Sequence, residues 1–291
     1  MATMRDIKRR KESVSSTGQI TKAMKLVATV KLQKAKSRAE SSKPYFDQMY
    51  KTVSSILSKS GGINHPYLSG NDSKKKAVIV ITSSRGLAGG YNANVIKLIT
   101  KDDRFDADNT VIFAVGKKGA TTFNRLGYDI KKDYSEVIND PLFSDAMEIG
   151  REVLKGYEDG EYGEIYLAYT VFKNTVTHIP TLLKLVPIVN EEGEGESETE
   201  SDTDNLTLMN YEPEAEETLD MLIPKYVNSI IFGALVQAVA SENGARMQAM
   251  DSATNNAEEM IADLTLKYNR ARQSAITQEL TEIIAGSAAV E

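Results

Sequence analysis

The two ends of the chain carry apolar residues at helical spacing. Towards the N-terminus, steps of three, four or seven residues, with a drift around Gly18, pass through Ile7, Val14, Ile20, Met24 and Val27. This period is typical of an α-helix, and Thr3 followed three residues later by Asp6 is a typical helix start. Pro44 is the only proline in this span, so a bend or break is expected there. We predict one long helix over residues 3–59, extending ~85 Å at about 1.5 Å per residue.

A second long helix is predicted from Pro213 to Gly286, with Pro224 near its start and no later proline. Its apolar positions are Val227, Ile230, Ala234, Ala238, Ala245, Met250, Ala253, Ala257, Met260, Leu264, Tyr268, Ala271 and Ala275. Most steps between them are three or four residues, which is the spacing of a coiled-coil seam. Such a helix extends ~105 Å at about 1.5 Å per residue.

Between these segments, short apolar runs alternate with helical patterns. Residues 60–73 are rich in turn-forming residues and end the first helix. Strands are predicted at 77–82, 111–115, 165–172 and 182–189, and helices at 93–100, 117–126 and 142–157. This alternation is typical of an α/β domain with a mainly parallel sheet. The last two strands are expected to pair as a hairpin.

Charge is distributed unevenly along the chain. The formal net charge is −6, yet residues 1–40 contain eleven Lys/Arg against three Asp/Glu, a balance of +8. Residues 191–217 contribute twelve acids and no base. A low-complexity acidic segment does not bury enough apolar surface to order itself. We predict an acidic mobile loop at 190–205 within the wider acidic run 190–217, with residues 206–209 as a short edge strand.

The two long helices are predicted to pack against each other in opposite directions. Residues 242–291 carry four Lys/Arg and eight Asp/Glu, a balance of −4 that complements the basic N-terminal helix. Small residues at the seam permit a close approach, namely Ala23, Ala28, Ala35, Ala245, Ala253 and Ala257. The predicted fold class is therefore α/β, with a long antiparallel two-helix coiled coil formed by the terminal helices and an inserted α/β (Rossmann-like) domain. The predicted domains are the N-terminal helix at 1–59, the α/β domain at 74–210 and the C-terminal helix at 211–291.

Composition excludes several kinds of site. The 291 residues include no cysteine, which excludes disulfides, iron–sulfur clusters and thiol catalysis. His65 and His178 are the only histidines and neither has a ligand-spaced partner, so no metal site is expected. No run of 18 apolar residues occurs, so no membrane span is expected. The basic N-terminus lacks the apolar core of a secretory signal.

A glycine-rich turn, SSRGLAGGYN at 83–92, follows the first predicted strand and precedes a helix, where phosphates often bind. Tyr91 and Asn92 stand where a P-loop has Lys and Ser or Thr, and glycines at 86, 89 and 90 do not match the dinucleotide spacing. We interpret the segment as a tight turn that needs positive φ angles. A ligand or partner contact is the alternative.

Three other features have simpler interpretations than a site. The acidic run fits a solvated loop better than a nucleic-acid mimic or a cation site. The basic N-terminal helix interleaves lysines with apolar residues and has no aromatic residue before Tyr45, so nucleic-acid binding is not expected. Glu279 and Glu282 face one way on a helix, but no other polar catalytic group is near them in sequence, so acid–base catalysis is not expected.

Four segments resemble the γ subunit of the F1 part of F-type ATP synthase. They are MRDIKRRKESVSSTGQITKAMKLVA at 4–28, SSRGLAGGYN at 83–92, ASENGARMQAMDSATNNA at 240–257 and YNRARQSAITQELTEIIAGSAA at 268–289. The resemblance covers nearly the full length and preserves the order of the motifs. Ser84 stands where the family usually has Asp, and Ser287 where Ala usually follows the Gly. The acidic loop at 191–204 looks like an insertion or an unusually charged variant.

The resemblance implies a rotor shaft without catalytic residues, metal or cofactor of its own. Its implied partners are the α and β subunits of F1, which hold the ATP sites, the ε subunit, and the ring of c subunits in Fo. Membrane association would be indirect through Fo, at the cytoplasmic face of the cell membrane. The absence of a transit peptide favours this bacterial setting.

A shaft inside a collar needs a second, partly apolar surface besides its seam, so Leu26 and Leu32 need not match the seam. Lysine stems cover apolar surface while the charge stays in water. We therefore predict that Lys22, Met24 and Lys25 lie at the collar contact. By the family's pattern, Arg246, Arg270 and Gln273 are expected to contact a catalytic subunit. Glu279 is counted with these contact residues.

Two alternatives remain open from the sequence. The first is an α/β enzyme with a ligand at the Ser83–Tyr91 turn and a coiled-coil dimerisation arm. The second is a coiled-coil scaffold whose basic end binds nucleic acid.

Overall fold

The computed structural model describes residues 3–59, 65–188 and 215–288. Its elements are α1 (Met4–Lys59), α2 (Pro66–Ser69), β1 (Lys76–Ile81), α3 (Tyr91–Thr100), β2 (Thr110–Val115), α4 (Lys117–Arg125), β3 (Asp129–Asp133), η1 (Val137–Asn139), α5 (Phe143–Glu158), β4 (Glu164–Phe172), β5 (His178–Val186) and α6 (Ala215–Ala288). The predicted α/β fold with two long terminal helices is confirmed. The edge strand predicted at 206–209 and the acidic loop at 190–205 lie outside the described residues.

The chain divides into two compact units. Met1–Val30 and Arg246–Glu291 form a helical unit, and Lys31–Ala245 form an α/β unit. Both α1 and α6 contribute residues to each unit. The division by sequence order into 1–59, 74–210 and 211–291 stays a prediction.

The start of α1 has the predicted cap. The backbone N–H of Asp6 donates to Oγ1 of Thr3 at 3.3 Å, and the backbone N–H of Thr3 donates to Oδ2 of Asp6 at 3.0 Å. These two bonds satisfy donors that a helix start otherwise leaves unpaired. Pro44 lies inside α1 and does not end it.

The sheet has five strands in the order β3-β2-β1-β4-β5. β1 pairs in parallel with β2 and β4, and β2 pairs in parallel with β3. β4 and β5 pair antiparallel, as the predicted hairpin requires. β5 begins at His178 rather than at residue 182, and β3 was not predicted.

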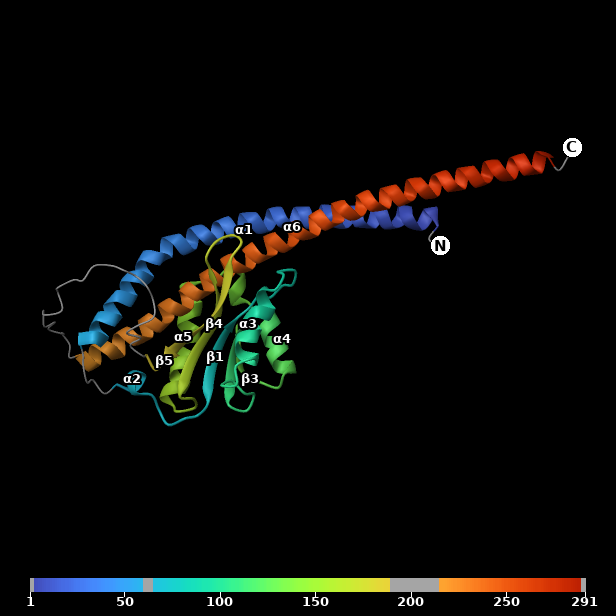
Figure 1. Cartoon of the computed structure of the whole chain (residues 1–291). Coiled ribbons are helices and arrows are strands. Elements are labelled where there is room, and N and C mark those ends of the chain that lie inside the picture. The colour runs from blue at the N-terminus through green and yellow to red at the C-terminus, as the bar shows by residue number, and fades with distance from the viewer. Residues whose placement is uncertain (1–2, 60–64, 189–214, 289–291) are drawn as a thin grey trace. The chain divides into compact units, whose positions relative to one another are not determined.

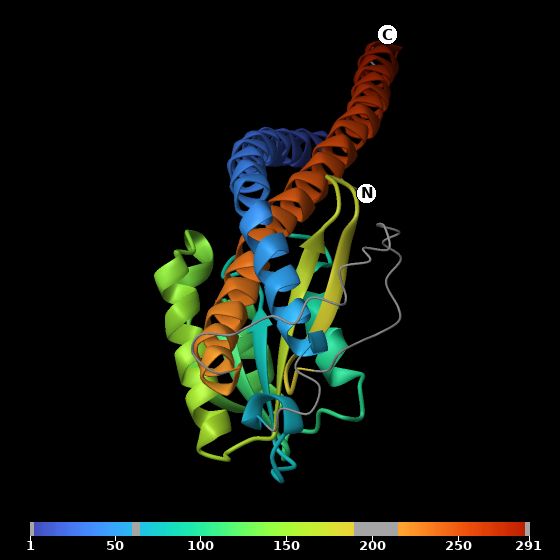
Figure 2. The same cartoon turned by 90° about the vertical axis from the view of Figure 1, so that its left-hand side faces the viewer.

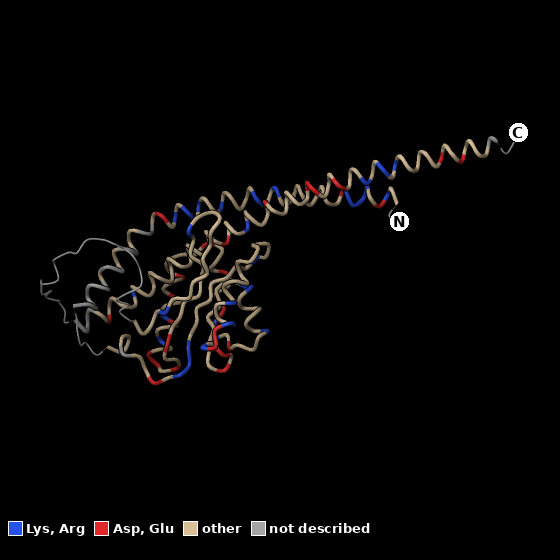
Figure 3. Tube along the Cα trace, viewed as in Figure 1, with Lys and Arg blue, Asp and Glu red and all other residues tan. Residues whose placement is uncertain are grey.

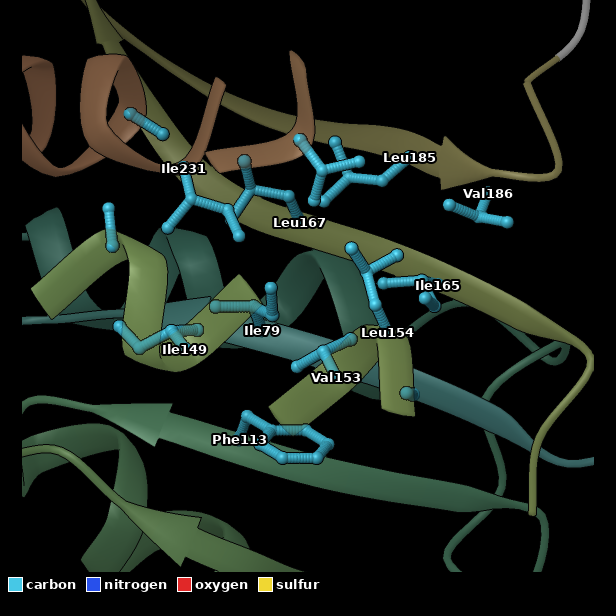
Figure 4. Close-up of a cluster of buried hydrophobic side chains, with 14 of the residues drawn as sticks. Ile79, Phe113, Ile149, Val153, Leu154, Ile165, Leu167, Leu185, Val186 and Ile231 are labelled. Carbon is cyan, nitrogen blue, oxygen red and sulfur yellow. The ribbon is translucent and has the colours of Figure 1, made fainter. Parts of the chain in front are cut away.

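Helices cover both faces of the sheet, as Figures 1 and 2 show. On one face, Ile79 of β1 and Phe113 of β2 pack in one cluster with Ile149 of α5 and Ile231 of α6 (Figure 4). On the other face, a second cluster joins strand residues such as Val78 to α3 and α4. Because side chains alternate between the faces, a strand covered on both sides reads as a continuous apolar run. This explains the apolar run in β1, Ala77–Ile81, in which every residue is buried.

The β4–β5 hairpin packs against α6 within the α/β unit. Oγ of Ser241 donates to the backbone O of Thr170 at 3.1 Å. Pro180 stands opposite Thr170 in the strand register and has no N–H to offer. At the end of the hairpin, His178 lies so close to Gly244 that a Cβ on this glycine would be 2.6 Å from Cε1 of the imidazole. The glycine therefore leaves room for the histidine ring.

One part of α6 is apolar enough for a membrane span by length and composition. Within Leu219–Gly286, an 18-residue window has a mean hydropathy of 1.4, and half of that window is buried. Leu219, Ile223, Val227 and Leu235 belong to the core cluster beneath the sheet. The hydropathy of α6 thus fits a helix that packs in the core of the α/β unit.

Candidate functional site

The paired helices of the helical unit approach each other closely. α1 and α6 run side by side in opposite directions in this unit (Figure 1). A Cβ built on Gly18 would lie 3.3 Å from Cβ of Ala257, so the two backbones are nearly in contact there. Oγ1 of Thr21 lies 2.8 Å from Oγ1 of Thr254, and both threonines are buried. Small and short side chains at these positions permit this spacing.

An ion pair follows the two threonines along the seam. Nζ of Lys25 lies 2.5 Å from Oδ1 of Asp251, and both side chains are partly exposed. From Gly18 to Thr21 to Lys25, each step along α1 is matched by a step of three residues in the opposite direction along α6. The predicted antiparallel packing of the terminal helices is confirmed in this unit.

The outer faces of the helical unit are also apolar. The exposed apolar side chains are Ile20, Leu26, Val27 and Val30 on α1 and Met260 and Leu266 on α6. Leu26, with 64% of its surface exposed, lies outside the seam as expected. Leu32, in the part of α1 that belongs to the α/β unit, is only 7% exposed, so it does not add to the exposed apolar surface. Its neighbours at helical spacing, Ala28 and Ala35, are buried as well and mark the same side of α1.

The last part of α6 exposes a stripe of large aliphatic side chains. From Arg272 to Gly286, every side chain of α6 is exposed. The stripe consists of Ile276, Leu280, Ile283 and Ile284, and the last of these is 68% exposed. In Figure 1, α6 continues past the start of α1 within this unit. Contiguous exposed apolar surface of this kind marks a site for interaction with another protein.

All seven predicted contact residues lie in the helical unit, namely Lys22, Met24, Lys25, Arg246, Arg270, Gln273 and Glu279. Lys22 is exposed and Met24 is half-buried. Lys25 does not present an unpaired positive charge at the surface, because its ammonium group forms an ion pair with Asp251. Arg246 is half-buried, whereas Arg270, Gln273 and Glu279 are exposed towards the end of α6. Their contacts with another subunit stay predictions.

The seam residues Thr21, Thr254 and Asp251 were not singled out from the sequence. The signal in the sequence that could have indicated these contacts is that polar side chains lie on the seam side of both helices, separated by matching numbers of residues. Without knowledge of the register, this signal does not say which pairs meet.

Positive charge gathers at the start of α1. Figure 3 shows the Lys and Arg positions of this segment, which are Arg5, Lys8, Arg9, Arg10 and Lys11. A groove of about 460 Å³ lies beside them, lined by Lys8, Lys11, Glu12, Ser15, Ser16, Gln19 and Tyr268. Arg5, Lys8, Arg9 and Arg10 are exposed, and Lys11 is half-buried. Most of the basic charge of α1 is therefore directed towards solvent or a partner.

The glycine-rich turn is closed by its own hydrogen bonds. The backbone N–H of Ser83 donates to Oδ1 of Asn92 at 2.8 Å, and Oγ of Ser84 donates to the backbone O of Ser135 at 2.7 Å. Gly89 has a φ of 55°, which confirms a turn that needs positive φ. Leu87 also has a positive φ, 63°, which the sequence did not predict.

α6 packs beside the crevice where such sheets bind ligands. In an open parallel sheet, ligands bind at the carboxyl ends of strands where the strand order reverses, here between β1 and β4. The phenol of Tyr91, at the start of α3, donates to the backbone O of Ala238 in α6 at 3.3 Å. Ser241 of the same helix donates to Thr170 in β4. α6 therefore contacts both sides of this crevice.

The two histidines lie in separate environments of the α/β unit. Nε2 of His65 is 3.0 Å from Oδ1 of Asp220, and its Nδ1 accepts from the backbone N–H of Tyr67. His178 stacks on Phe172 with ring centroids 5.9 Å apart. Over the described ranges 3–59, 65–188 and 215–288, no group of three or more His, Cys, Asp or Glu side chains is arranged to hold a metal ion.

The sequence and the fold are similar to those of known proteins. A family model described as ATP synthase matches residues 3–290. The chain is 67% identical to the ATP synthase gamma chain of Lachnoclostridium phytofermentans, with all of both chains covered. It is 44% identical to the sodium-ion-specific ATP synthase gamma chain of Acetobacterium woodii, covering 99% of this chain and 98% of that one.

Solved structures share the fold at low sequence identity. A chain in the mitochondrial ATP synthase of Euglena gracilis, from a structure of OSCP, F1 and the c-ring, has a TM-score of 0.67 at 16% identity, covering 99% of this chain and 94% of that chain. A chain from the central stalk and c-ring of the Tetrahymena thermophila mitochondrial enzyme has a TM-score of 0.58 at 23% identity, covering 80% of this chain and 99% of that chain.

The full-length match to the family and the high identity over whole chains agree with the motifs at both ends of the sequence. The paired terminal helices and the inserted five-stranded sheet are the fold of the same group of proteins. On these grounds the chain belongs to the ATP synthase gamma chain family.

Proposed function

We propose that this chain is the central rotor shaft of an F1Fo ATP synthase, which transmits torque between an ion-driven membrane ring and a catalytic hexamer. The names of its relatives support this role. The observation that carries the proposal is that the helical unit has two separate sets of apolar side chains. One side of each helix closes the seam, and a second set of apolar side chains remains exposed along the outer faces and the end of α6. A shaft that turns inside a collar of other subunits requires both.

The proposed roles follow the three sequence segments. Residues 1–59 and 211–291 form the shaft, and residues 74–210 form the foot. The α and β subunits of F1 form the collar around the helical unit, while ε and the c-ring meet the foot. Lys22, Met24, Lys25, Arg246, Arg270, Gln273 and Glu279 are the proposed contacts with the collar.

The chain is proposed to be a non-catalytic subunit whose partners hold the ATP sites. Support comes from the contact of α6 with the crevice of the sheet and from the hydrogen bonds that close the turn at 83–92. The rival function, an α/β enzyme with a ligand at this turn, has no support from that geometry. In this proposal the chain is peripheral at the cytoplasmic face of the cell membrane and associates with the membrane through Fo.

Purification from native membranes at low salt tests the proposal. The α, β and ε subunits and the c-ring should accompany this chain in constant proportion, and the complex should pump ions when ATP is supplied. In a parallel measurement, the isolated full-length chain should not bind ATP tightly. Stoichiometric ATP binding by the chain alone, or its isolation without these subunits, would argue for a different function.

A further inference from the structure

We propose that Thr21, Thr254, Lys25 and Asp251 form a register key, a set of polar contacts that fixes the axial register of α1 against α6 in the helical unit. The mechanical part of this inference rests on the proposed rotor function and deepens it. The structural part concerns the chain alone and is tested separately.

The buried half of the register key is a hydrogen-bonded hydroxyl pair. Thr21 and Thr254 are only 9% and 8% exposed. Oγ1 of Thr21 lies 3.0 Å from the backbone O of Gly18, and Oγ1 of Thr254 lies 2.8 Å from the backbone O of Met250. Each hydroxyl has a single proton. Whichever hydroxyl donates across the seam, the accepting one donates to a carbonyl of its own helix, so both hydroxyls are satisfied.

The exposed half of the register key is the ion pair. Nζ of Lys25 and Oδ1 of Asp251 are 2.5 Å apart, with side chains 39% and 48% exposed. Solvent and salt weaken such a pair, so its contribution to overall stability is small. The ion pair instead favours one alignment of the two helices, because that alignment places opposite charges together and others do not. Polar and charged side chains at coiled-coil interfaces are the residues that commonly specify register.

A shift of one helical turn is unfavourable in either direction. In one direction, Met247 replaces Asp251 opposite Lys25, so the ammonium group loses its carboxylate partner. The same shift brings Met250 opposite Thr21, whose hydroxyl then loses its partner across the seam. In the other direction, the carboxylate of Glu258 comes opposite Thr21 in the seam. An unpaired polar group in a buried seam costs its full desolvation penalty.

The apolar part of the seam does not by itself exclude the first of these shifts, which brings Met250 opposite Thr21. Gly18 meets Ala257, and in that shift the residue opposite Gly18 would be Ala253, which is an identical side chain. Small apolar residues therefore accept more than one alignment. The register key distinguishes between alignments that the small residues tolerate equally. Two helices that cannot slide past each other resist bending and twisting better than two helices that can.

Cysteine cross-linking measures the register directly, because the chain contains no cysteine. The native alignment is reported by the pair Gly18→Cys and Ala257→Cys, whose Cβ atoms are close enough for a disulfide. Alignments shifted by one turn are reported by Gly18→Cys with Ala253→Cys, and by Gly18→Cys with Ile261→Cys. All three pairs are made in the full-length chain and oxidised under the same conditions.

Each reporter is compared in four backgrounds. The first is unmodified, and the second, Thr21→Ser with Thr254→Ser, retains both hydroxyls as the matched control. The third, Thr21→Val with Thr254→Val and Asp251→Lys, removes the hydroxyls and opposes two ammonium groups. The fourth, Lys25→Asp with Asp251→Lys, exchanges the charges and retains the threonines.

The native reporter should form fastest in the unmodified, serine and charge-exchanged chains. In the third background the ratio of native to shifted cross-links should fall by roughly tenfold, which is within the usual range of coupling between contacting residues. An unchanged ratio in the third background would overturn the register key. So would a failure of the charge-exchanged chain to retain the native ratio.

The assembled complex then tests the mechanical consequence. Complexes with the third background should hydrolyse ATP but pump fewer ions per ATP than the serine control. A role in stability alone would lower the yield of complex and leave the ions pumped per ATP unchanged, which would overturn the mechanical part. If the unmodified chain joins no complex, the rotor function fails, while the cross-linking result still decides the register.

Discussion

Gly116 occupies a backbone conformation that only glycine accepts at that place. Its φ is 103°, and a Cβ there would lie 2.1 Å from the backbone O of Thr82. We predict that Gly116→Ala lowers the free energy of unfolding by more than the ~1–2 kcal/mol that a left-handed conformation alone costs. Urea unfolding of the two proteins measures the difference. Gly127→Ala is the matched control, because Gly127 has a φ of 85° and no neighbouring atom within 4 Å of the added Cβ; equal losses would contradict a steric origin.

His178 gives the β4–β5 hairpin a dependence on pH. Its ring lies between Phe172 and Gly244, and neither ring nitrogen has a hydrogen-bond partner within the described part of the chain. Burial lowers the pKa of His178 from its ordinary value of 6.5. The nearest charged residues in sequence on the packed segments are Lys173, which directly follows β4, and Glu242 on α6, which is buried.

The sign of the effect follows from the direction of the pKa shift. Between the lowered pKa and 6.5, the released imidazole binds more protons than the packed one. The packed hairpin is therefore most stable above pH 6.5 and loses stability as the pH falls through this window. Hydrogen exchange of the β4–β5 amides, corrected for the intrinsic exchange rate, should show weaker protection at acid pH. His178→Phe should abolish this trend, and a trend that persists in the variant would assign it to another group.

Among the elements, α6 has two parts with different predicted sensitivity to deletion. Residues 275–291 follow the seam, and the described side chains among them are exposed. A chain that ends at Ser274 should keep its free energy of unfolding within about 0.5 kcal/mol, as is usual for changes at exposed positions. The same truncation should weaken binding to the α and β subunits, because it removes Ile276, Leu280, Ile283 and Ile284.

Removal of residues 1–17 is the comparison for this truncation. It deletes the part of α1 that contains Ile7 and Val14, both partly buried, and exposes the apolar seam of α6. The melting temperature should fall clearly for this variant and not for the chain that ends at Ser274. Equal stability of both truncated chains would show that the seam contributes little.

The elements also show what the sequence could predict. The long helices and the buried strands have strong periodic or continuous apolar patterns, so their positions were predicted to within a few residues. β3 has the sequence DIKKD, with a single apolar residue, and it forms because β2 supplies a parallel edge for it. β5 begins before its apolar run, since pairing with β4 extends it to His178. Tertiary pairing decided both cases, and local sequence does not contain that information.

The candidate site was predictable in outline and not in its contacts. The exposed Leu26 and the basic start of α1 followed from the pattern of the first helix. The pairing of Lys25 with Asp251 did not, because the register of two antiparallel helices is a property of both sequences together. The same reason hid the contact between Thr21 and Thr254.

For the whole molecule, the rotor proposal predicts a separation between assembly and coupling. Arg246 is a half-buried charge on α6 and a proposed contact with a catalytic subunit. Arg246→Glu should leave the composition of the purified complex unchanged and lower ATP-driven ion pumping. Arg246→Lys keeps the charge and is the matched control. Undiminished pumping by the charge-reversed variant would remove Arg246 from the proposed contacts.

The close approach of Gly18 and Ala257 limits how this protein can change during evolution. Because the two backbones are nearly in contact there, neither helix can accommodate an added turn without moving the other. A relative with a longer or shorter coil would have to gain or lose residues in both helices together, at positions that face each other. Unmatched insertions should be confined to segments outside the seam, such as the turns of the α/β unit.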